Sequence, residues 1–322
     1  MKDVYELSAK VPINMSGMRF DQAASELFPD FSRSRLQSWI KDGQLTVDGR
    51  VTKPKEKLIG GEVLDLNAEL EAQGTWEPEE IQLNIVHEDD DLIIINKPAG
   101  LVVHPAAGNQ TGTLLNALLN HVPDLINLPR AGIVHRLDKE TTGLMVVAKT
   151  LEAHTDLVEQ LADRTVSREY EAIAVGVMTG GGTVDAPMGR HPTQRKLMAV
   201  LSSGGKRAVT HYRVAKRYPH HTHIRVKLET GRTHQIRVHM AHIGFNLVGD
   251  STYGKRFRIP KGANQHLIDT LKAFPRQALH AAKLGLEHPG TGEYTEWTAP
   301  VPPDFQNLLD ALNKGYIHDD EE

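Results

Sequence analysis

The residues most able to do chemistry form a short polar run inside an otherwise apolar stretch at 132–147. The run reads HRLDKETT from residue 135 to residue 142, so a histidine, an arginine, a lysine and two carboxylates stand together. Asp138 and Glu140 could act as a nucleophile and an acid. A solvated hairpin tip with internal ion pairs between two apolar strands would show the same pattern. Because functional residues favour loops held by a rigid scaffold, the segment is a candidate site.

Other kinds of site are disfavoured. The sequence has no GxxxxGK[ST] motif, and its glycines at 180–182 lie between apparent strands, so we expect no nucleotide cofactor. Histidines gather at 220–223 without a carboxylate beside them, and at 234–242 beside arginines that would repel a divalent cation. The chain has no cysteine, which excludes disulfides, thiolate zinc sites and cysteine nucleophiles. We therefore expect neither a metal nor a cofactor.

The elements that must hold the polar run are a mixture of strands and helices. Turn-like glycines at 180–182 and 289–292 suggest hairpins, which favour an α+β fold with a mixed, mostly antiparallel sheet and flanking helices. Apolar runs and helical spacing predict strands at 93–96, 144–148, 170–175, 209–214 and 224–228 and helices at 113–122, 151–162, 233–243 and 304–314.

A small amino-terminal unit precedes this part. Its spacing predicts a helix at 19–27 and a second helix that starts at Ser32 and stops at Gly43. Asp48 and Gly49, between the apolar residues of 45–47 and Val51, indicate a hairpin. The sequence thus predicts a small α/β domain.

Charge marks the boundary between the two units. Ten of the 41 acidic residues lie within residues 65–91, which contain no lysine or arginine, and four more end the chain. The other 27 acids face 37 basic residues, so a net charge of −4 hides a body with a charge of +10. We expect a domain at 1–80, with an acidic linker at about 65–91, and a second at 81–322 with an acidic tail.

Basic residues concentrate on the amino-terminal unit. They could form a solvated helix face or a surface that grips phosphates. The run SRSRLQSWIKDG at 32–43 with VDG at 47–49 resembles the small RNA-binding module of ribosomal protein S-four, which favours RNA binding. The candidate RNA-binding residues are Arg33, Arg35, Lys41, Lys53 and Lys55.

The larger unit resembles the RluA family of pseudouridine synthases. The likeness covers nearly the whole chain, apart from the acidic tail and residues 255–265. It rests on HRLD at 135–138 followed by TG at 142–143, GRTHQIRVH at 231–239, NKPAGLVVHP at 96–105, REYEA at 168–172 and RQALHA at 276–281.

This resemblance implies isomerisation of uridine to pseudouridine in RNA without a cofactor, and it implies site residues. Asp138 matches the family's nucleophile, and Arg237 matches the basic partner that keeps it ionised. Attack on the base, attack on the ribose and proton abstraction all stay open. Tyr170 matches the residue that stacks on the uracil or assists proton transfer, and Ile236 the one that packs near the base. Arg136 matches the arginine that enters the space left by a flipped base.

The implied partner is large-subunit ribosomal RNA or an assembly intermediate that contains it, with clustered uridines of the helix 69 loop as targets. One alternative is a ribosome-assembly factor that binds RNA and has an idle catalytic domain; another is a histidine-rich metalloenzyme. No apolar run reaches the roughly 18 residues needed to cross a bilayer, so we expect no membrane partner and a cytoplasmic location. A monomer is the expected state.

Overall fold

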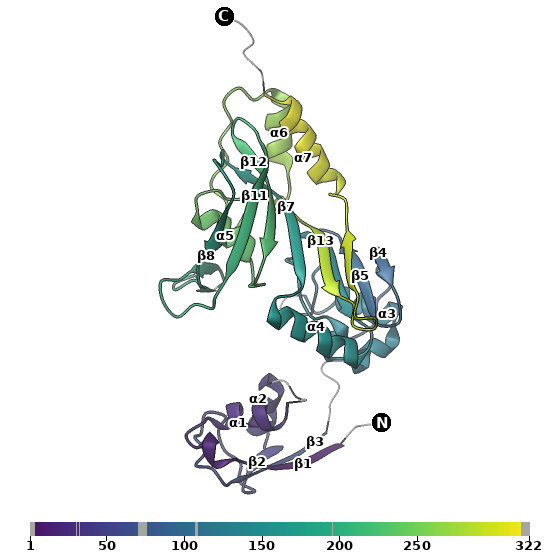
Figure 1. The fold of residues 1–322 in the computed structure, drawn as a ribbon, viewed down its shortest axis with the longest axis vertical. Helices are drawn as coiled ribbons and strands as arrows, with labels where there is room; N and C mark the ends of the chain where they lie inside the picture. Colours follow the sequence, from purple (N-terminus) through teal and green to yellow (C-terminus); the bar gives the residue numbers. More distant parts are fainter. Residues whose placement is uncertain are drawn as a thin grey trace, which may run out of the picture. The chain divides into compact units, whose positions relative to one another are not determined.

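The computed structural model describes residues 4–29, 31, 33–69, 76–106, 109–194 and 196–316. The chain divides into two compact units, Met1–Trp76 and Glu77–Glu322, and each is considered by itself (Figure 1). The expected helix start at Ser32, the middle of the acidic segment at 70–75 and the acidic tail lie outside the described residues.

The amino-terminal unit packs two helices on a small antiparallel sheet. One apolar cluster joins them, with Phe20, Leu36 and Ile40 from the helices against Leu45 and Leu64 from the strands. The strands follow the order β1-β3-β2. The elements are β1 (Val4–Lys10), η1 (Ile13–Met15), α1 (Phe20–Leu27), α2 (Arg33–Lys41), β2 (Leu45–Val47) and β3 (Val63–Glu69).

The predicted hairpin around Asp48 and Gly49 is wrong in its second strand. Both residues have positive φ, 47° and 71°, and Val47 and Arg50 exchange two backbone hydrogen bonds across them, as a tight hairpin turn requires. The chain then leaves the sheet, and Val51 is 65% exposed. The strand that pairs with β2 is the distant β3, because it brings Leu64 and Leu66 into the core that residue 51 does not reach.

The larger unit is built on one nine-stranded sheet in the order β4-β5-β6-β13-β7-β12-β11-β8, with β14 beside β13 (Figure 1). Among the described strands only β6 and β13 pair in parallel, so the predicted mixed, mostly antiparallel sheet is confirmed. The strands are β4 (Ile85–Glu88), β5 (Leu92–Lys97), β6 (Thr142–Ala148), β7 (Ser167–Val175), β8 (Gly182–Asp185), β11 (Val209–Arg217), β12 (His221–Leu228), β13 (Leu279–Glu287) and β14 (Tyr294–Thr298), with a separate pair β9 (Met188–Arg190) and β10 (Met198–Val200).

Helices flank this sheet and bury their apolar sides. Leu157 of α4 packs with Leu144 of β6 and Leu284 of β13, whereas Leu271 of α6 and Phe305 of α7 share a second cluster. The four predicted helices are confirmed, and α6 was missed. The elements are α3 (Leu114–His121), η2 (Pro123–Asn127), η3 (Pro129–Gly132), α4 (Leu151–Asp163), α5 (Gln235–His242), α6 (Gln265–Ala273) and α7 (Pro303–Lys314).

Two local predictions for this unit are wrong. Glycines 180–182 do not close a hairpin, since β7 pairs with β12 and β13, and β8 pairs with β11. A Cβ atom on Gly181 would lie 2.7 Å from the Tyr212 carbonyl oxygen, so this glycine allows close strand approach instead. Likewise, residues 132–134, directly before the polar run, form no strand, and an isolated bridge joins Ile133 to Val147.

None of the described helices combines the length and the apolar character that a bilayer crossing requires.

Candidate active site

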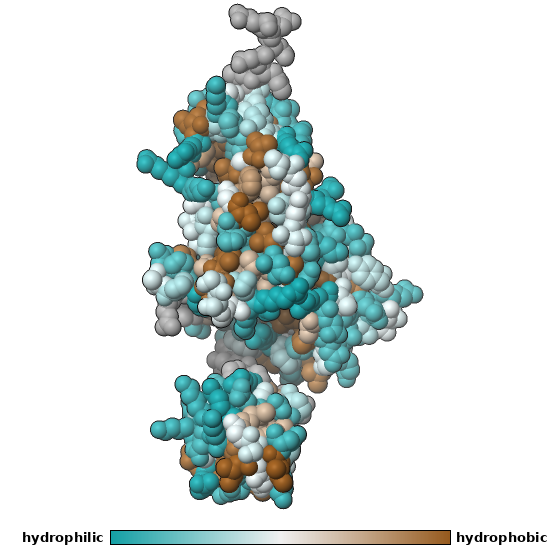
Figure 2. Space-filling model, turned by 60° about the vertical axis from the view of Figure 1, so that its left-hand side comes forward, coloured by the Kyte–Doolittle hydropathy of each residue, from teal (hydrophilic) through white to brown (hydrophobic). Residues whose placement is uncertain are grey.

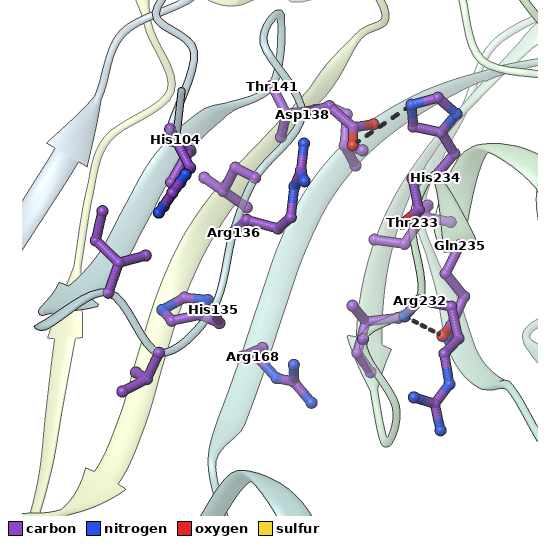
Figure 3. A pocket seen from close by; sticks show the side chains of 18 of the residues that line it. His104, His135, Arg136, Asp138, Thr141, Arg168, Arg232, Thr233, His234 and Gln235 are labelled. Carbon is purple, nitrogen blue, oxygen red and sulfur yellow. Dashed lines mark hydrogen bonds and ion pairs between the residues drawn. The ribbon is translucent and has the colours of Figure 1, made fainter. Parts of the chain in front are cut away.

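A cavity of about 550 Å³ opens in the larger unit, and the polar run forms part of its wall (Figure 3). The other walls come from residues 103–106, from β7 and from residues 228–237 at the start of α5, so segments far apart in the sequence meet here. All five site residues that the sequence predicts for this unit line the same cavity: Arg136, Asp138, Tyr170, Ile236 and Arg237.

Among the described residues, only one side of Asp138 is held by a hydrogen bond. Its Oδ2 accepts a hydrogen bond of 3.0 Å from Arg237 Nη1. Its Oδ1 has His234 Nε2 as a neighbour at 3.8 Å, which is beyond hydrogen-bond distance. The side chain of Asp138 is 18% exposed, so one carboxylate oxygen keeps free lone pairs that face the cavity.

Arg237 is itself fixed from behind by Asp250. Its Nε and Nη2 donate to the two carboxylate oxygens of Asp250 at 2.7 and 2.9 Å, a bidentate geometry that fixes the guanidinium plane. Burial alone would raise the pKa of Asp250, but the hydrogen bonds from Arg237 hold it below its usual value. Asp250 also accepts the backbone N–H groups of Thr252 and Tyr253. Asp250 was not predicted from the sequence, because it stands in none of the motifs.

His234 is oriented by a second residue that the sequence analysis missed, Tyr253. The Tyr253 hydroxyl accepts the Met198 N–H at 3.0 Å and forms a second hydrogen bond with His234 Nδ1 at 2.7 Å. The other ring nitrogen of His234, Nε2, is directed at Asp138 (Figure 3). Burial lowers the pKa of His234, although the charge of Asp138 opposes this shift. His234 also has a left-handed backbone, with φ of 57°, at the turn into α5.

The loop that carries Asp138 is braced at successive residues. Buried Lys97 donates to the carbonyl oxygens of Pro98, Leu101 and Lys139 at 2.7 to 3.0 Å. Burial lowers the pKa of Lys97 to about 8, although the charges of Glu140 and Asp138 oppose that fall. Three side chains of the 276–281 motif brace the following residues: Arg276 donates to the Glu140 carbonyl, Gln277 to the Thr141 hydroxyl, and His280 bonds the Thr142 hydroxyl.

The remaining predicted residues complete the cavity wall. Tyr170 of β7 is buried, and burial raises the pKa of its hydroxyl, so the phenol is protonated near neutral pH. Ile236 precedes Arg237 on α5 and is also buried. Arg136 is exposed, and its side chain extends into the cavity beside Asp138 (Figure 3).

Two members of the polar run do not serve as acids or bases in this arrangement. His135 Nε2 accepts the Val146 N–H at 3.0 Å, and burial lowers its pKa to about 3, so the ring is a neutral brace between the loop and β6. Glu140 is not among the residues that line the cavity. Asp138 is therefore the carboxylate of the run that faces the cavity.

Comparison with known proteins agrees with this geometry. Residues 91–242 match the RNA pseudouridylate synthase family, and residues 18–64 match the S4 domain. Ribosomal large subunit pseudouridine synthase D of Pseudomonas aeruginosa is 63% identical over 98% of each chain. The chain is an RluA-family pseudouridine synthase.

Other relatives agree. Ribosomal large subunit pseudouridine synthase D of Escherichia coli K12 is 57% identical to this synthase and covers 98% of it, with 97% of the relative matched. Among solved structures, human RNA pseudouridylate synthase domain containing 4 is similar with a TM-score of 0.56 and 27% identity, over 71% of this chain and 93% of its own. The predicted family, enzyme class and S4-like amino-terminal domain are thereby confirmed.

The basic residues predicted on the S4 domain of the synthase differ in their surroundings. Arg33 donates to buried Asp21 at 2.8 Å, and the Arg35 guanidinium lies 5.6 Å from the centre of the Trp39 ring. These two arginines are thus partly used within the domain. Lys41, Lys53 and Lys55 are exposed. Their roles in RNA binding stay predictions.

Within the described part of the synthase, one cluster has the chemistry of metal ligands: His87, Asp89 and His288. Both histidines contact Asp89 Oδ2 through Nε2, at 2.6 and 2.9 Å. His288 Nδ1 accepts the backbone N–H groups of Gly290 and Thr291, so its Nε2 carries the proton and donates to Asp89. That nitrogen has no lone pair for an ion. The cluster fits a brace between two turns better than a metal site.

Proposed function

We propose that this synthase converts uridines of large-subunit ribosomal RNA to pseudouridine, in the helix 69 loop, with Asp138 as its nucleophile and without a cofactor. The substrate follows the names of its relatives, which are ribosomal large subunit pseudouridine synthases. The observation that carries the role of Asp138 is its one-sided bonding, because the free oxygen faces a cavity large enough for a nucleobase.

The target uridine must leave its stack to reach this cavity. Flipping costs a few kcal/mol. The enzyme has to offset that cost with contacts to the displaced base and to the space that the base leaves in the RNA. Exposed Arg136 has a planar guanidinium that can stack in the gap. Inside the cavity, the protonated Tyr170 ring and the Ile236 side chain offer an apolar surface against which uracil can pack.

The isomerisation then needs only groups that are already present. The bond between N1 and C1′ breaks, the uracil turns, a bond forms between C5 and C1′, and the proton of C5 is replaced by one on N1. Asp138 takes part through its free oxygen, by adding to the base or the ribose or by abstracting a ribose proton, and is released at the end. Arg237, fixed by Asp250, holds the other oxygen throughout. Atoms and electrons balance without a co-reactant.

The S4 domain would bind the substrate, either free RNA or an assembling particle, through Arg33, Arg35, Lys41, Lys53 and Lys55. We further propose that a monomer is the active form. We place its action in the cytoplasm, where ribosomes assemble.

Mapping of pseudouridine in ribosomal RNA tests the proposal. Cells that lack the protein should lose pseudouridine at helix 69, and the wild-type chain should restore it. Asp138→Asn should restore none, whereas Glu140→Gln, two residues away and outside the cavity lining, should restore it in full. Restoration by Asp138→Asn would overturn the nucleophile. Loss of ribosome assembly without any change in pseudouridine would favour the assembly-factor alternative.

A further inference from the structure

A basic loop leads to α6 from Asp250, which bonds the cavity residue Arg237. Residues 251–264 contain four basic residues and no acidic residue. All four cationic side chains are exposed, and none of them forms a hydrogen bond or an ion pair with the described residues. They are Lys255, Arg256, Arg258 and Lys261, and we call residues 255–261 the basic loop.

Several exposed or buried arginines elsewhere in the larger unit have acidic partners, unlike the cations of the basic loop. Arg207 pairs with Glu229, Arg225 with Glu171, and Arg276 with Asp304. Cations that lie close together without acidic partners repel one another, so a surface of this kind is suited to a polyanion.

Apolar side chains stand between the cations. Phe257 is 43% exposed and Ile259 is 62% exposed, and Phe257 lies directly between Arg256 and Arg258 in the chain. An exposed aromatic ring flanked by cations is the combination with which proteins bind single-stranded nucleic acid, since the ring stacks on a base while the cations contact phosphates. An acidic protein surface would match the charge but would leave the ring without a planar partner.

Both ends of the basic loop are fixed. Tyr253, two residues before it, bonds His234, and its ring lies 5.1 Å from the Arg237 guanidinium. Gly254 follows, and a Cβ there would lie 2.1 Å from the Asp250 carbonyl oxygen. The glycine therefore allows the chain to pass close to Asp250, the residue that holds Arg237. At the other end Pro260 is buried, and the Asn264 N–H donates to the Gly315 carbonyl at 2.7 Å. The loop therefore starts at the structure that positions Asp138.

We propose that the basic loop binds the RNA strand next to the target uridine, with its cations on phosphates and with Phe257 stacked on an unpaired neighbouring base. The inference rests on the proposed function, because the uridine in the cavity determines which nucleotides reach the loop. Flipping of one base leaves its neighbours unstacked, and an exposed aromatic ring can take the place of the lost stacking partner.

A matched pair of double variants tests the charge contacts. Arg256→Gln with Arg258→Gln removes two cations from the loop. Arg213→Gln with Lys227→Gln removes two exposed cations from β11 and β12 on the opposite face of the sheet, because Leu228, the next residue after 227, lines the cavity. Binding of a labelled, unmodified helix 69 hairpin RNA is measured between 50 and 300 mM salt, roughly, with both pairs in an Asp138→Asn chain.

The loop variant should bind about tenfold more weakly, and the slope of log affinity against log salt should become shallower by about 1.4, as two lost contacts to a single strand require. The control variant should match the parent chain. An unchanged affinity and slope for the loop variant would overturn the proposal and would leave an acidic protein as the partner to test.

Substitutions of Phe257 test the stacking contact separately. Phe257→Leu should weaken binding several-fold at every salt concentration without a change in slope, and Phe257→Tyr should restore it, because only a planar ring stacks on a base. Equal affinities for the two variants would refute stacking. Conversion of the same hairpin by the wild-type chain is measured in parallel. Absence of product would refute the proposed function. Unchanged binding by the loop variants, together with normal product from the wild-type chain, would refute only this inference.

Discussion

The two units each contain an aspartate held by arginine, but the two carboxylates have opposite surroundings. Asp21, at the start of α1, is fully buried, and both of its oxygens accept hydrogen bonds, from Arg19 and Arg33 among others. Asp138 is partly exposed, and within the described part of the chain only one of its carboxylate oxygens accepts a hydrogen bond, from Arg237. Both sites pair an aspartate with an arginine, but they differ in how many carboxylate oxygens accept a hydrogen bond.

This difference separates a structural carboxylate from a reactive one. A buried carboxylate with all its oxygens bonded ties several side chains together, and adding a reactant to it would first require breaking those bonds. A carboxylate that keeps one free oxygen beside a cavity can form a new bond while its partner arginine stays in place. Asp250 makes this possible, since it fixes Arg237 from the other side and leaves Nη1 for Asp138.

The largest expected effect comes from removing the shared arginine. Arg237→Met should lower single-turnover pseudouridine formation by about 10²- to 10³-fold, because Asp138 loses its oriented partner. The same change leaves the buried Asp250 carboxylate without its cationic partner, so the free energy of unfolding should fall by about 3 kcal/mol. Arg237→Lys should keep more activity than the methionine variant but less than wild type, since an ammonium does not bond both Asp250 oxygens as a fork. Wild-type rates for Arg237→Met would refute the role of this pair.

A smaller effect, on stability alone, is expected for Asp21→Asn. Loss of the charge-assisted bonds to Arg19 and Arg33 should lower the stability of the amino-terminal unit by about 2 kcal/mol while kcat stays unchanged. Burial alone would raise the pKa of Asp21, but the bonds from Arg33, Gln37 and Arg19 lower it below 3.8. Its contribution is therefore full above about pH 4 and is lost as pH falls through the lowered folded pKa.

Denaturant unfolding at pH 7 and at lower pH checks this prediction, with exposed Glu26→Gln as the control in the same helix. Asp21→Asn should remove part of the acid sensitivity of the wild-type unit, and Glu26→Gln should not. A large loss of kcat in Asp21→Asn would contradict the assignment of Asp21 as a structural carboxylate.

The smallest effect should come from Tyr253→Phe. The ring still lies over Arg237, but His234 Nδ1 loses its hydrogen-bond partner, so the imidazole beside Asp138 is held less firmly. We expect kcat to fall by about three- to tenfold with little change in KM. Tyr294→Phe, on exposed β14, is the control. A loss as large as that of Arg237→Met would mean that Tyr253 supports the ion pair itself.

Most helices and strands followed from the sequence because their signals are local. The apolar spacing of 151–162 and 304–314 predicted α4 and α7, and β-branched runs predicted the central strands. Errors arose where the partner of a segment is distant. The turn at Asp48 and Gly49 formed as its residues require, yet β2 pairs with β3, and the glycines at 180–182 serve close strand approach. Pairing depends on which distant strand completes the core, and local spacing does not contain that information.

The same division holds for the site. The sequence by itself determined the family and pointed to Asp138, Arg136, Tyr170, Ile236 and Arg237, because these residues stand in recognisable motifs. Only the tertiary structure decided that Arg237 reaches across 99 positions to one oxygen of Asp138, and that Asp250, Tyr253 and Lys97 hold the groups around it. Such contacts join segments that the sheet and its loops bring together. The residue types of the site are therefore local features of the sequence, whereas their geometry depends on packing between distant parts of the chain.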